Sequence, residues 1–188
     1  MKKVVIVLAP GFEETEAVMT IDLLRRAGFE VRIAGLSGLE VNGSRNIRVQ
    51  ADILLKDLSE AFDALVLPGG MPGAKNLAES SLFEGFIGRA FAEKWLVAAI
   101  CAAPAVVLAS KGYLKGRRFT CFTGREKDVQ DGIFCAEPVV KDGQLITSRG
   151  PGTTADFAFE IIRTLADEAL ARQVFEQALF PLPGCAAR

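Results

Sequence analysis

The 188-residue sequence contains no histidine. A Ser-His-Asp triad, a Cys-His dyad or a His-ligated zinc site therefore cannot be built within this chain. Acid–base chemistry has to use carboxylates, lysine, cysteine or the single tyrosine, Tyr113.

Long hydrophobic runs are also missing, although 50% of the residues are hydrophobic. The run that follows Lys2 and Lys3 covers only residues 4–9 before Pro10 and Gly11 end it. That is shorter than the core of a secretory signal, and far shorter than the roughly 18 residues of a membrane span. We therefore expect no membrane partner and a cytoplasmic location.

An excess of charge of one sign is absent as well. The chain has 22 Lys and Arg against 23 Asp and Glu, which gives a net charge of −1. This balance lacks the basic footprint of nucleic-acid-binding proteins, so we expect no nucleic-acid partner. The length favours a single domain over residues 1–180, with residues 181–188 as a flexible tail.

The four cysteines, Cys101, Cys121, Cys135 and Cys185, do not form a known pattern. No two of them have the close spacing that zinc ribbons and redox dithiols use. Free thiols in a reducing compartment are the expectation, with no metal site and no cofactor.

Apolar runs alternate with helical periodicity along the chain, which indicates βαβ units and a mostly parallel sheet. Thr153 and Asp156 fit a capping box at the start of one helix. The predicted strands are residues 4–9, 31–34, 64–67, 96–100 and 119–122, with a short strand near 44–50 and a hairpin across 141–143. The predicted helices are residues 14–27, 82–94, 103–110, 157–165 and 168–179. The fold class is α/β, a flavodoxin-like sandwich with helices on both faces of the sheet.

Cys101 stands where a predicted strand turns directly into a helix, with small residues two places away on either side. This is the layout of a nucleophile elbow, usually written G-x-S-x-G. We expect the N–H groups of the following helix to point at the sulfur and to depress the pKa of the thiol. A buried structural cysteine is the alternative, and it is the commoner fate of this residue.

Glu16 borders the apolar stripe of the first predicted helix. It can therefore face the carboxyl edge of the sheet, where desolvation would raise its pKa and allow it to donate a proton to a nearby thiolate. Glu13 and Glu14 need no such role, because acidic residues in a first helical turn already complement the helix dipole.

Two further loops follow predicted strands. In the glycine-rich turn 68–73, the N–H of Gly70 is positioned to act with that of Ala102 as an oxyanion donor. A tight βα turn explains the same glycines without function. Arg45 lies in a polar loop, where it either binds an anion or is simply solvated.

Four segments together resemble the ThiJ/PfpI superfamily, and within it the DJ-1/YajL branch. They are residues 8–18, 67–70, 98–104 and 147–153, and the likeness extends over about residues 3–180. By this resemblance, Cys101 matches the reactive cysteine and Glu16 the acid that hydrogen-bonds it. Gly70 and Ala102 match the oxyanion donors.

The resemblance also implies a flavodoxin-like fold and a homodimer. Arg26 and Arg45 match arginines near the site and the dimer interface, and Arg45 is placed to reach the pocket of a partner. Many relatives carry a histidine before the last hairpin, where Asp131 is the nearest equivalent here. The absence of histidine argues against protease-like and amidotransferase-like activities, because both need a Cys-His pair.

The function that the resemblance implies is a glutathione-independent glyoxalase acting on small reactive aldehydes, with related deglycase activity on glycated adducts. The alternative is a redox-sensing stress-response chaperone whose reactive cysteine is oxidised to sulfinate. Both depend on Cys101 and Glu16. An inert relative with the same fold is the third possibility.

Overall fold

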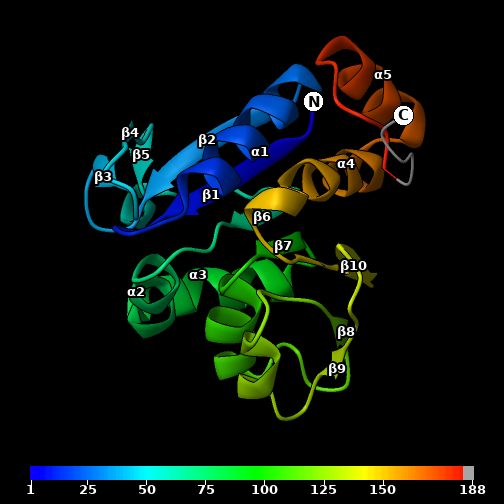
Figure 1. The fold of residues 1–188 in the computed structure, drawn as a ribbon. Coiled ribbons are helices and arrows are strands. Elements are labelled where there is room, and N and C mark those ends of the chain that lie inside the picture. Colours follow the sequence, from blue (N-terminus) through cyan, green and yellow to red (C-terminus); the bar gives the residue numbers. More distant parts are fainter. Residues whose placement is uncertain (184–188) are drawn as a thin grey trace.

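The computed structural model describes residues 1–183, and a seven-stranded sheet forms its centre (Figure 1). The strand order is β10-β11-β7-β6-β1-β2-β5, and only the β10–β11 pair is antiparallel. The strands of this sheet are β1 (Lys3–Leu8), β2 (Glu30–Gly35), β5 (Ile53–Leu54), β6 (Ala64–Leu67), β7 (Leu96–Ile100), β10 (Val139–Asp142) and β11 (Leu145–Ser148). The predicted mostly parallel α/β sheet and the hairpin across residues 141–143 are confirmed.

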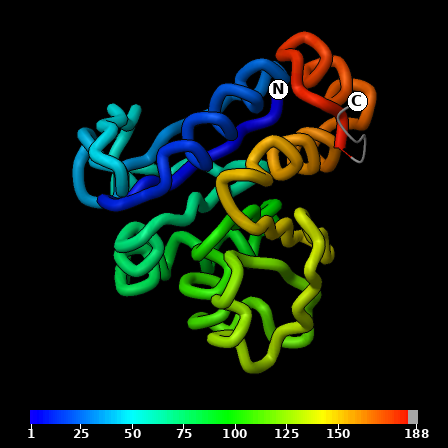
Figure 2. The backbone as a smooth tube through the Cα atoms, in the orientation of Figure 1, coloured from blue at the N-terminus to red at the C-terminus, as the bar shows by residue number. Residues whose placement is uncertain are grey.

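The central strands are buried along almost their whole length because helices cover both faces of the sheet. α1, α4 and α5 pack together on one face, and α2, α3 and η2 on the other (Figures 1 and 2). The helices are α1 (Glu14–Arg26), α2 (Gly73–Glu79), α3 (Ser81–Ala92), α4 (Thr154–Leu165) and α5 (Glu168–Gln177). The shorter turns are η1 (Leu55–Asp57), the π-helix η2 (Pro104–Leu108), η3 (Ala109–Lys111), η4 (Arg125–Asp128) and η5 (Pro151–Thr153).

Two pairs of short strands lie outside the main sheet. One is the antiparallel pair β3 (Glu40–Asn42) and β4 (Arg48–Gln50), whose connecting loop carries Arg45. The other is the parallel pair β8 (Arg118–Phe119) and β9 (Ile133–Phe134). The first pair meets the turn that follows β1, because the N–H of Gly11 donates to the carbonyl of Asn42 at 2.8 Å.

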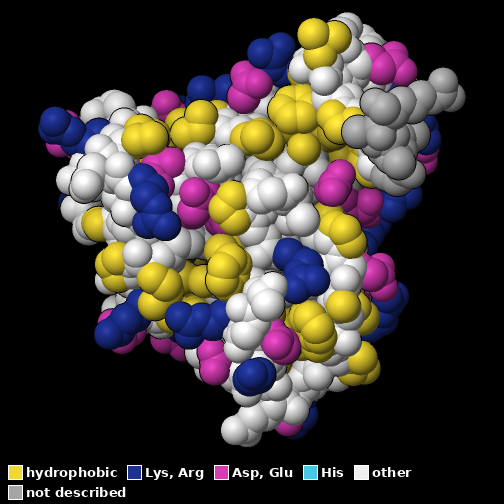
Figure 3. Space-filling view, in the orientation of Figure 1, with side chains coloured by type: hydrophobic (Ala, Val, Ile, Leu, Met, Phe, Trp, Pro, Cys, Tyr) yellow, Lys and Arg dark blue, Asp and Glu magenta, His cyan; other side chains and the backbone are white. Residues whose placement is uncertain are grey.

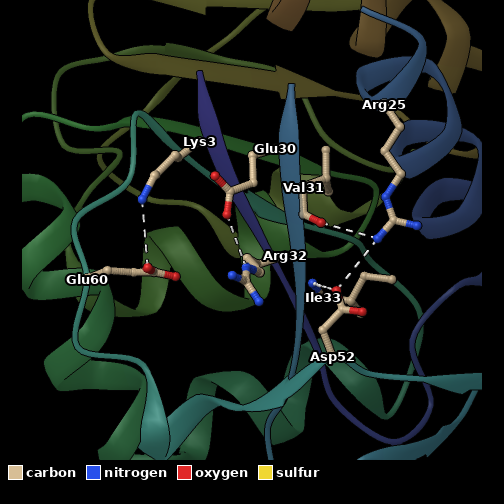
Figure 4. Close-up of polar contacts among 8 residues, drawn as sticks. All are labelled: Lys3, Arg25, Glu30, Val31, Arg32, Ile33, Asp52 and Glu60. Carbon is tan, nitrogen blue, oxygen red and sulfur yellow. Dashed lines mark hydrogen bonds and ion pairs between the residues drawn. The ribbon is translucent and has the colours of Figure 1, made fainter. Parts of the chain in front are cut away.

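Polar contacts fix the edge of the sheet near β2 (Figure 4). Asp52 Oδ2 accepts the backbone N–H of Ile33 at 2.8 Å and lies 3.6 Å from Arg25 Nη2. The same Arg25 nitrogen donates to the carbonyl of Val31 at 3.2 Å. These contacts join the last turn of α1 to β2 and to the segment before β5, and so fix the far end of α1.

Several local predictions need correction. The capping box at Thr153 is wrong: Thr153 Oγ1 lies 2.7 Å from Ser148 Oγ, and it does not cap α4. The strand expected over residues 119–122 is only β8, which ends at Phe119. The helix expected over residues 103–110 is the π-helix η2 followed by the turn η3, and α2 was not predicted at all.

The predicted flexible tail, residues 181–188, falls mostly outside the described residues, as does Cys185. In its described part, Leu182 is half-buried and packs against the core. Whether residues 1–180 form one independent domain stays a prediction.

Candidate active site

Cys101 is the first residue after β7, and its backbone has a φ of +65°. Residues other than glycine rarely adopt this left-handed backbone conformation, which costs them roughly 1–3 kcal/mol. Its N–H donates to the carbonyl of Ser148 at 2.9 Å, and its own carbonyl accepts the N–H of Phe122 at 2.8 Å. These hydrogen bonds to two neighbouring segments hold the strained turn that the elbow pattern predicts.

Glu16 lies in the first turn of α1, and only 1% of the residue is exposed. Glu13 caps this helix by accepting the N–H of Glu16 at 2.7 Å. One carboxyl oxygen of Glu16, Oε2, accepts the N–H of Gly69 at 2.7 Å. The other, Oε1, is buried and has no hydrogen-bond partner among residues 1–183. The carboxyl group and the Cys101 thiol are close enough to shift each other's pKa. The sequence had placed Glu16 at this edge of the sheet, and the structure brings it to the sulfur.

Gly69, in the turn after β6, lies between the side chains of Glu16 and Cys101. A Cβ added at Gly69 would lie 2.6 Å from the Cβ of Cys101 and 2.9 Å from Glu16 Oε2. The next residue, Gly70, has a φ of +86°, which is costly for any other residue. Glycines at both positions let Glu16 and Cys101 approach, and they turn the N–H of Gly70 towards the sulfur.

Burial raises the pKa of Glu16 to about 7, although its hydrogen bonds to Cys101 and Gly69 oppose the shift. The charge of Glu13 adds to the increase. An acid with a pKa near neutrality can both release and accept a proton at physiological pH, which is what general acid–base chemistry requires.

The expected depression of the Cys101 pKa is wrong, because the pKa of this thiol is raised. Burial raises the pKa of the thiol, and the charge of Glu16 and a hydrogen bond to it raise it further. Backbone hydrogen bonds from Gly70 and Ala102 act in the opposite direction and lower it. The two groups therefore titrate as a pair, in which a protonated Glu16 removes the repulsion and favours the thiolate.

A cavity of about 290 Å³ opens over Cys101. Gly70 and Ala102 line it beside the cysteine, so the candidate oxyanion donors and the sulfur face the same space. The cavity is lined by Glu13, Ser44, Arg45, Gly70, Met71, Cys101, Ala102, Phe122, Arg125 and Pro151. Its position beyond the carboxyl ends of β6 and β7 is the usual place for a ligand in such sheets.

The two candidate arginines lie in different places. Arg45 lines the cavity of its own chain, where the loop that carries it is held by Glu14. Glu14 Oε1 accepts the N–H of Arg45 at 2.5 Å, and Glu14 Oε2 accepts the hydroxyl of Ser44 at 3.1 Å. Arg26 is at the opposite end of α1, about 15 Å along the helix from Glu16, and pairs with Asp22 at 2.7 Å. The structure therefore does not bring Arg26 to the cavity.

Asp131, taken from the sequence as the equivalent of the relatives' histidine, does not line the cavity either. It borders a separate hollow with Lys115 and Gly132. Phe122 and Arg125 occupy the wall instead, and sequence reasoning missed both. The only local signal was the turn sequence that follows β8, which gives no indication that this segment reaches Cys101.

Within residues 1–183, no three histidine, cysteine, aspartate or glutamate side chains gather as metal ligands do. None of the helices that these residues form has the length and apolarity needed to cross a bilayer. Cys121 is a buried free thiol and Cys135 a half-buried one.

Comparisons with known proteins give the family of this chain. The family model described as the DJ-1/PfpI family matches residues 2–164. Protein dj-1beta of Drosophila melanogaster is 41% identical over 177 residues, which cover 92% of this chain and 94% of that protein. A Caenorhabditis elegans relative named glutathione-independent glyoxalase DJR-1.2 is 36% identical, over 87% of this chain and 89% of its own.

Solved structures give the same result. A cysteine-to-alanine mutant of a DJ-1 superfamily protein from Salmonella typhimurium has a TM-score of 0.93 and 41% identity, covering 96% of this chain and all of that one. Oxidized Toxoplasma gondii DJ-1 has a TM-score of 0.91 and 34% identity, covering 96% of this chain and 99% of the other. The flavodoxin-like fold expected from the sequence is thus confirmed, and the chain belongs to the DJ-1/PfpI family.

Proposed function

We propose that the protein is a cofactor-independent glyoxalase, which converts methylglyoxal to lactate and glyoxal to glycolate without glutathione. The observation that carries this proposal is the buried, otherwise unpartnered Glu16 Oε1 beside a cysteine at a strained elbow. The glyoxalase named among the relatives supports the same reaction class.

The first step is the attack of the Cys101 sulfur on the aldehyde carbon of methylglyoxal. A carbon–sulfur bond forms, and the carbonyl oxygen takes the proton that Glu16 and Cys101 share, which gives a hemithioacetal. The N–H groups of Gly70 and Ala102 stabilise the negative charge that develops on this oxygen.

Glu16 carries out the second step as base and then as acid. Its carboxylate removes the proton from C1, which leaves an enediolate, and returns the proton to C2, while the proton of the C1 hydroxyl passes to the oxygen on C2. The product is a thioester of lactate on Cys101. Water cleaves the thioester, so that one methylglyoxal and one water give one lactate and the free thiol. No oxidant, metal or organic cofactor enters this balance.

The same attack on an early glycation adduct would be measured as deglycase activity, which is a second expression of the same chemistry. We also propose that the protein acts as a cytoplasmic homodimer, as the family resemblance implies. Light scattering tests the assembly, because a monomer of 20.2 kDa would contradict it.

A redox-sensing role is the second candidate. A relative solved in an oxidized form shares 34% of its sequence with this chain. A protonated Glu16 could donate to a sulfinate on Cys101 and stop oxidation at that stage. A gain of two oxygen atoms on Cys101 after mild peroxide treatment, read by mass spectrometry, is the result that this role requires.

Lactate formation tests the glyoxalase proposal. The purified protein is incubated with methylglyoxal in the absence of glutathione and metal, and lactate is measured against methylglyoxal consumed. Stoichiometric lactate from the wild type, and none from Cys101→Ala, supports the proposal. No lactate from a folded wild-type protein contradicts it.

A further inference from the structure

Two arginines from distant parts of the chain line the cavity above Cys101. Arg45 comes from the loop between β3 and β4, and Arg125 is the first residue of η4. The family resemblance gave Arg45 a general place near the site, but it gave no role to Arg125. Both residues therefore contribute to the wall of the one cavity that Cys101 also lines.

Neither guanidinium is neutralised by a buried ion pair. Arg45 Nη1 donates to the carbonyl of Ser44 at 3.3 Å, and no carboxylate within residues 1–183 forms an ion pair with it. Arg125 pairs with Asp128 at 3.2 Å, but both side chains are exposed, and such pairs are worth only about 0–1 kcal/mol. Both arginines therefore remain able to bind an incoming anion.

The acidic groups around the cavity do not cancel this charge. Glu13 is the acidic residue among those that line it, and one of its oxygens is already used by the N–H of Glu16 at 2.7 Å. Glu16 does not line the cavity and is buried against Gly69. Glu14, also at the start of α1, contacts the loop that carries Arg45, but its carboxylate accepts the backbone N–H groups of Arg45 and Ile47 and the Ser44 hydroxyl, and forms no ion pair with the guanidinium.

We propose that Arg45 and Arg125 form an anion-binding subsite at the mouth of the Cys101 cavity, which selects electrophiles that carry a carboxylate or phosphate. Guanidinium groups suit this role because they bind such oxyanions through two parallel hydrogen bonds. The cavity also has room for a longer substrate. The volume of this cavity is about 290 Å³.

The selectivity has to arise locally. The whole chain has a net charge of −1, which does not attract anions over long distances. On the face shown in Figure 3, acidic and basic side chains are interspersed, with no broad patch of one sign. A preference for anionic reagents at Cys101 would therefore report the two arginines rather than the field of the protein.

The substrate class that the subsite selects rests on the proposed glyoxalase reaction. The class is a 2-oxoaldehyde with an anionic group a few bonds from the ketone, for which 4,5-dioxovalerate is a probe. One 4,5-dioxovalerate and one water would give one 2-hydroxyglutarate. The proton again moves from the aldehyde carbon to the ketone carbon. The carboxylate that does not react would bind between Arg45 and Arg125.

Alkylation of Cys101 tests the subsite without any turnover. Iodoacetate and iodoacetamide both form a carbon–sulfur bond and release iodide, but only iodoacetate carries a negative charge. The rate for each reagent is followed by mass spectrometry of the peptide that contains Cys101. The quantity of interest is the ratio of the two rates.

Arg125→Gln and Arg45→Gln should each lower the iodoacetate-to-iodoacetamide ratio roughly fivefold, and added salt should reduce the ratio in the wild type. Arg125→Lys keeps the charge and should retain most of the ratio. Arg163→Gln is the matched control, because Arg163 also has an exposed side chain in an i,i+3 ion pair, with Glu160. Its ratio should equal that of the wild type.

An unchanged ratio in both Arg45→Gln and Arg125→Gln would overturn the subsite. An equal loss in Arg163→Gln would also overturn it, because the effect would then come from overall charge. Failure of the glyoxalase proposal is seen separately, as absence of lactate from methylglyoxal. If methylglyoxal is turned over, kcat/KM for 4,5-dioxovalerate should exceed that for its methyl ester, and no preference would contradict the substrate class.

Discussion

Glu16 and Cys101 meet across the backbone of Gly69, whose N–H donates to Glu16 Oε2 at 2.7 Å. This hydrogen bond occupies one carboxyl oxygen, and the other, Oε1, has no hydrogen-bond partner among residues 1–183. The acid is therefore oriented by the turn after β6, and the nucleophile by the turn after β7. Changes that separate the two groups should remove activity even when both side chains are retained.

Gly69→Ala is the most direct change of this kind. The added methyl group would lie 2.6 Å from the Cβ of Cys101, so the backbone has to shift. We expect a loss of about 1–3 kcal/mol in the free energy of unfolding. A displacement near 1 Å should lower the rate of lactate formation roughly 100-fold. Urea unfolding and the lactate assay measure the two effects.

Gly85→Ala provides the matched control. Gly85 is an exposed residue of α3, and a Cβ there meets nothing within 4 Å. Because alanine is a better helix former than glycine, the free energy of unfolding of this variant should rise by about 0.5–1 kcal/mol. Its activity should not change. Normal activity in Gly69→Ala as well would show that the close approach at Gly69 is not required.

The pH dependence of stability should reveal the buried acid. The pKa of Glu16 is about 7 in the folded protein, against an ordinary value of 4.5. The folded state thus holds the proton more tightly than the unfolded state. Its stabilising contribution is complete below pH 4.5 and is lost as the pH rises through 7, which amounts to about 3 kcal/mol.

Glu16→Gln should remove this dependence, because glutamine does not titrate. The free energy of unfolding of Glu16→Gln minus that of the wild type should therefore increase by about 3 kcal/mol between pH 4.5 and pH 8. Urea unfolding at several pH values measures it, with the exposed Glu176→Gln as control. Parallel curves for Glu16→Gln and the wild type would argue against a raised pKa.

Glu14, two residues before Glu16 in α1, should behave in the opposite way. Burial alone would raise the pKa of Glu14, but hydrogen bonds from the N–H groups of Arg45 and Ile47 and from Ser44 outweigh it and lower the pKa. Its contribution to stability is therefore present above pH 4.5 and lost as the pH falls. We expect Glu14→Gln to lower the free energy of unfolding by about 1–3 kcal/mol at pH 7, and by less at acid pH.

The same variant should weaken the anionic subsite, because Glu14 fixes the loop that carries Arg45. Ser44→Ala, which removes only one of these hydrogen bonds, should cost about 1 kcal/mol and serves as a graded control. Equal stability of Glu14→Gln and the wild type at pH 7 would contradict this account.

The sequence was sufficient to predict the site residues whose positions depend on local patterns. β7 is a continuous apolar run that ends at Cys101, and the small residues on either side indicate the sharp turn. Glu16 was found because its position on α1 follows from helical periodicity. In each case the signal lies within a few residues of the functional group.

Other features depend on contacts that are distant in sequence. Phe122 and Arg125 reach the cavity because the N–H of Phe122 bonds the carbonyl of Cys101, which no local pattern indicates. The capping box failed for a similar reason, since Thr153 Oγ1 bonds the hydroxyl of Ser148 from β11. The pKa of Cys101 was misjudged because the charge of Glu16 was not set against the backbone hydrogen bonds.

Lactate formation by Glu16→Gln tests the central claim most directly. Glutamine keeps the size of the side chain and a hydrogen-bond donor, but it cannot move a proton from C1 to C2. With methylglyoxal, the account predicts that Glu16→Gln loses lactate formation at least 100-fold, while Cys101 is still alkylated by iodoacetamide. Lactate formation at the wild-type rate would contradict the role of Glu16 as the acid–base group.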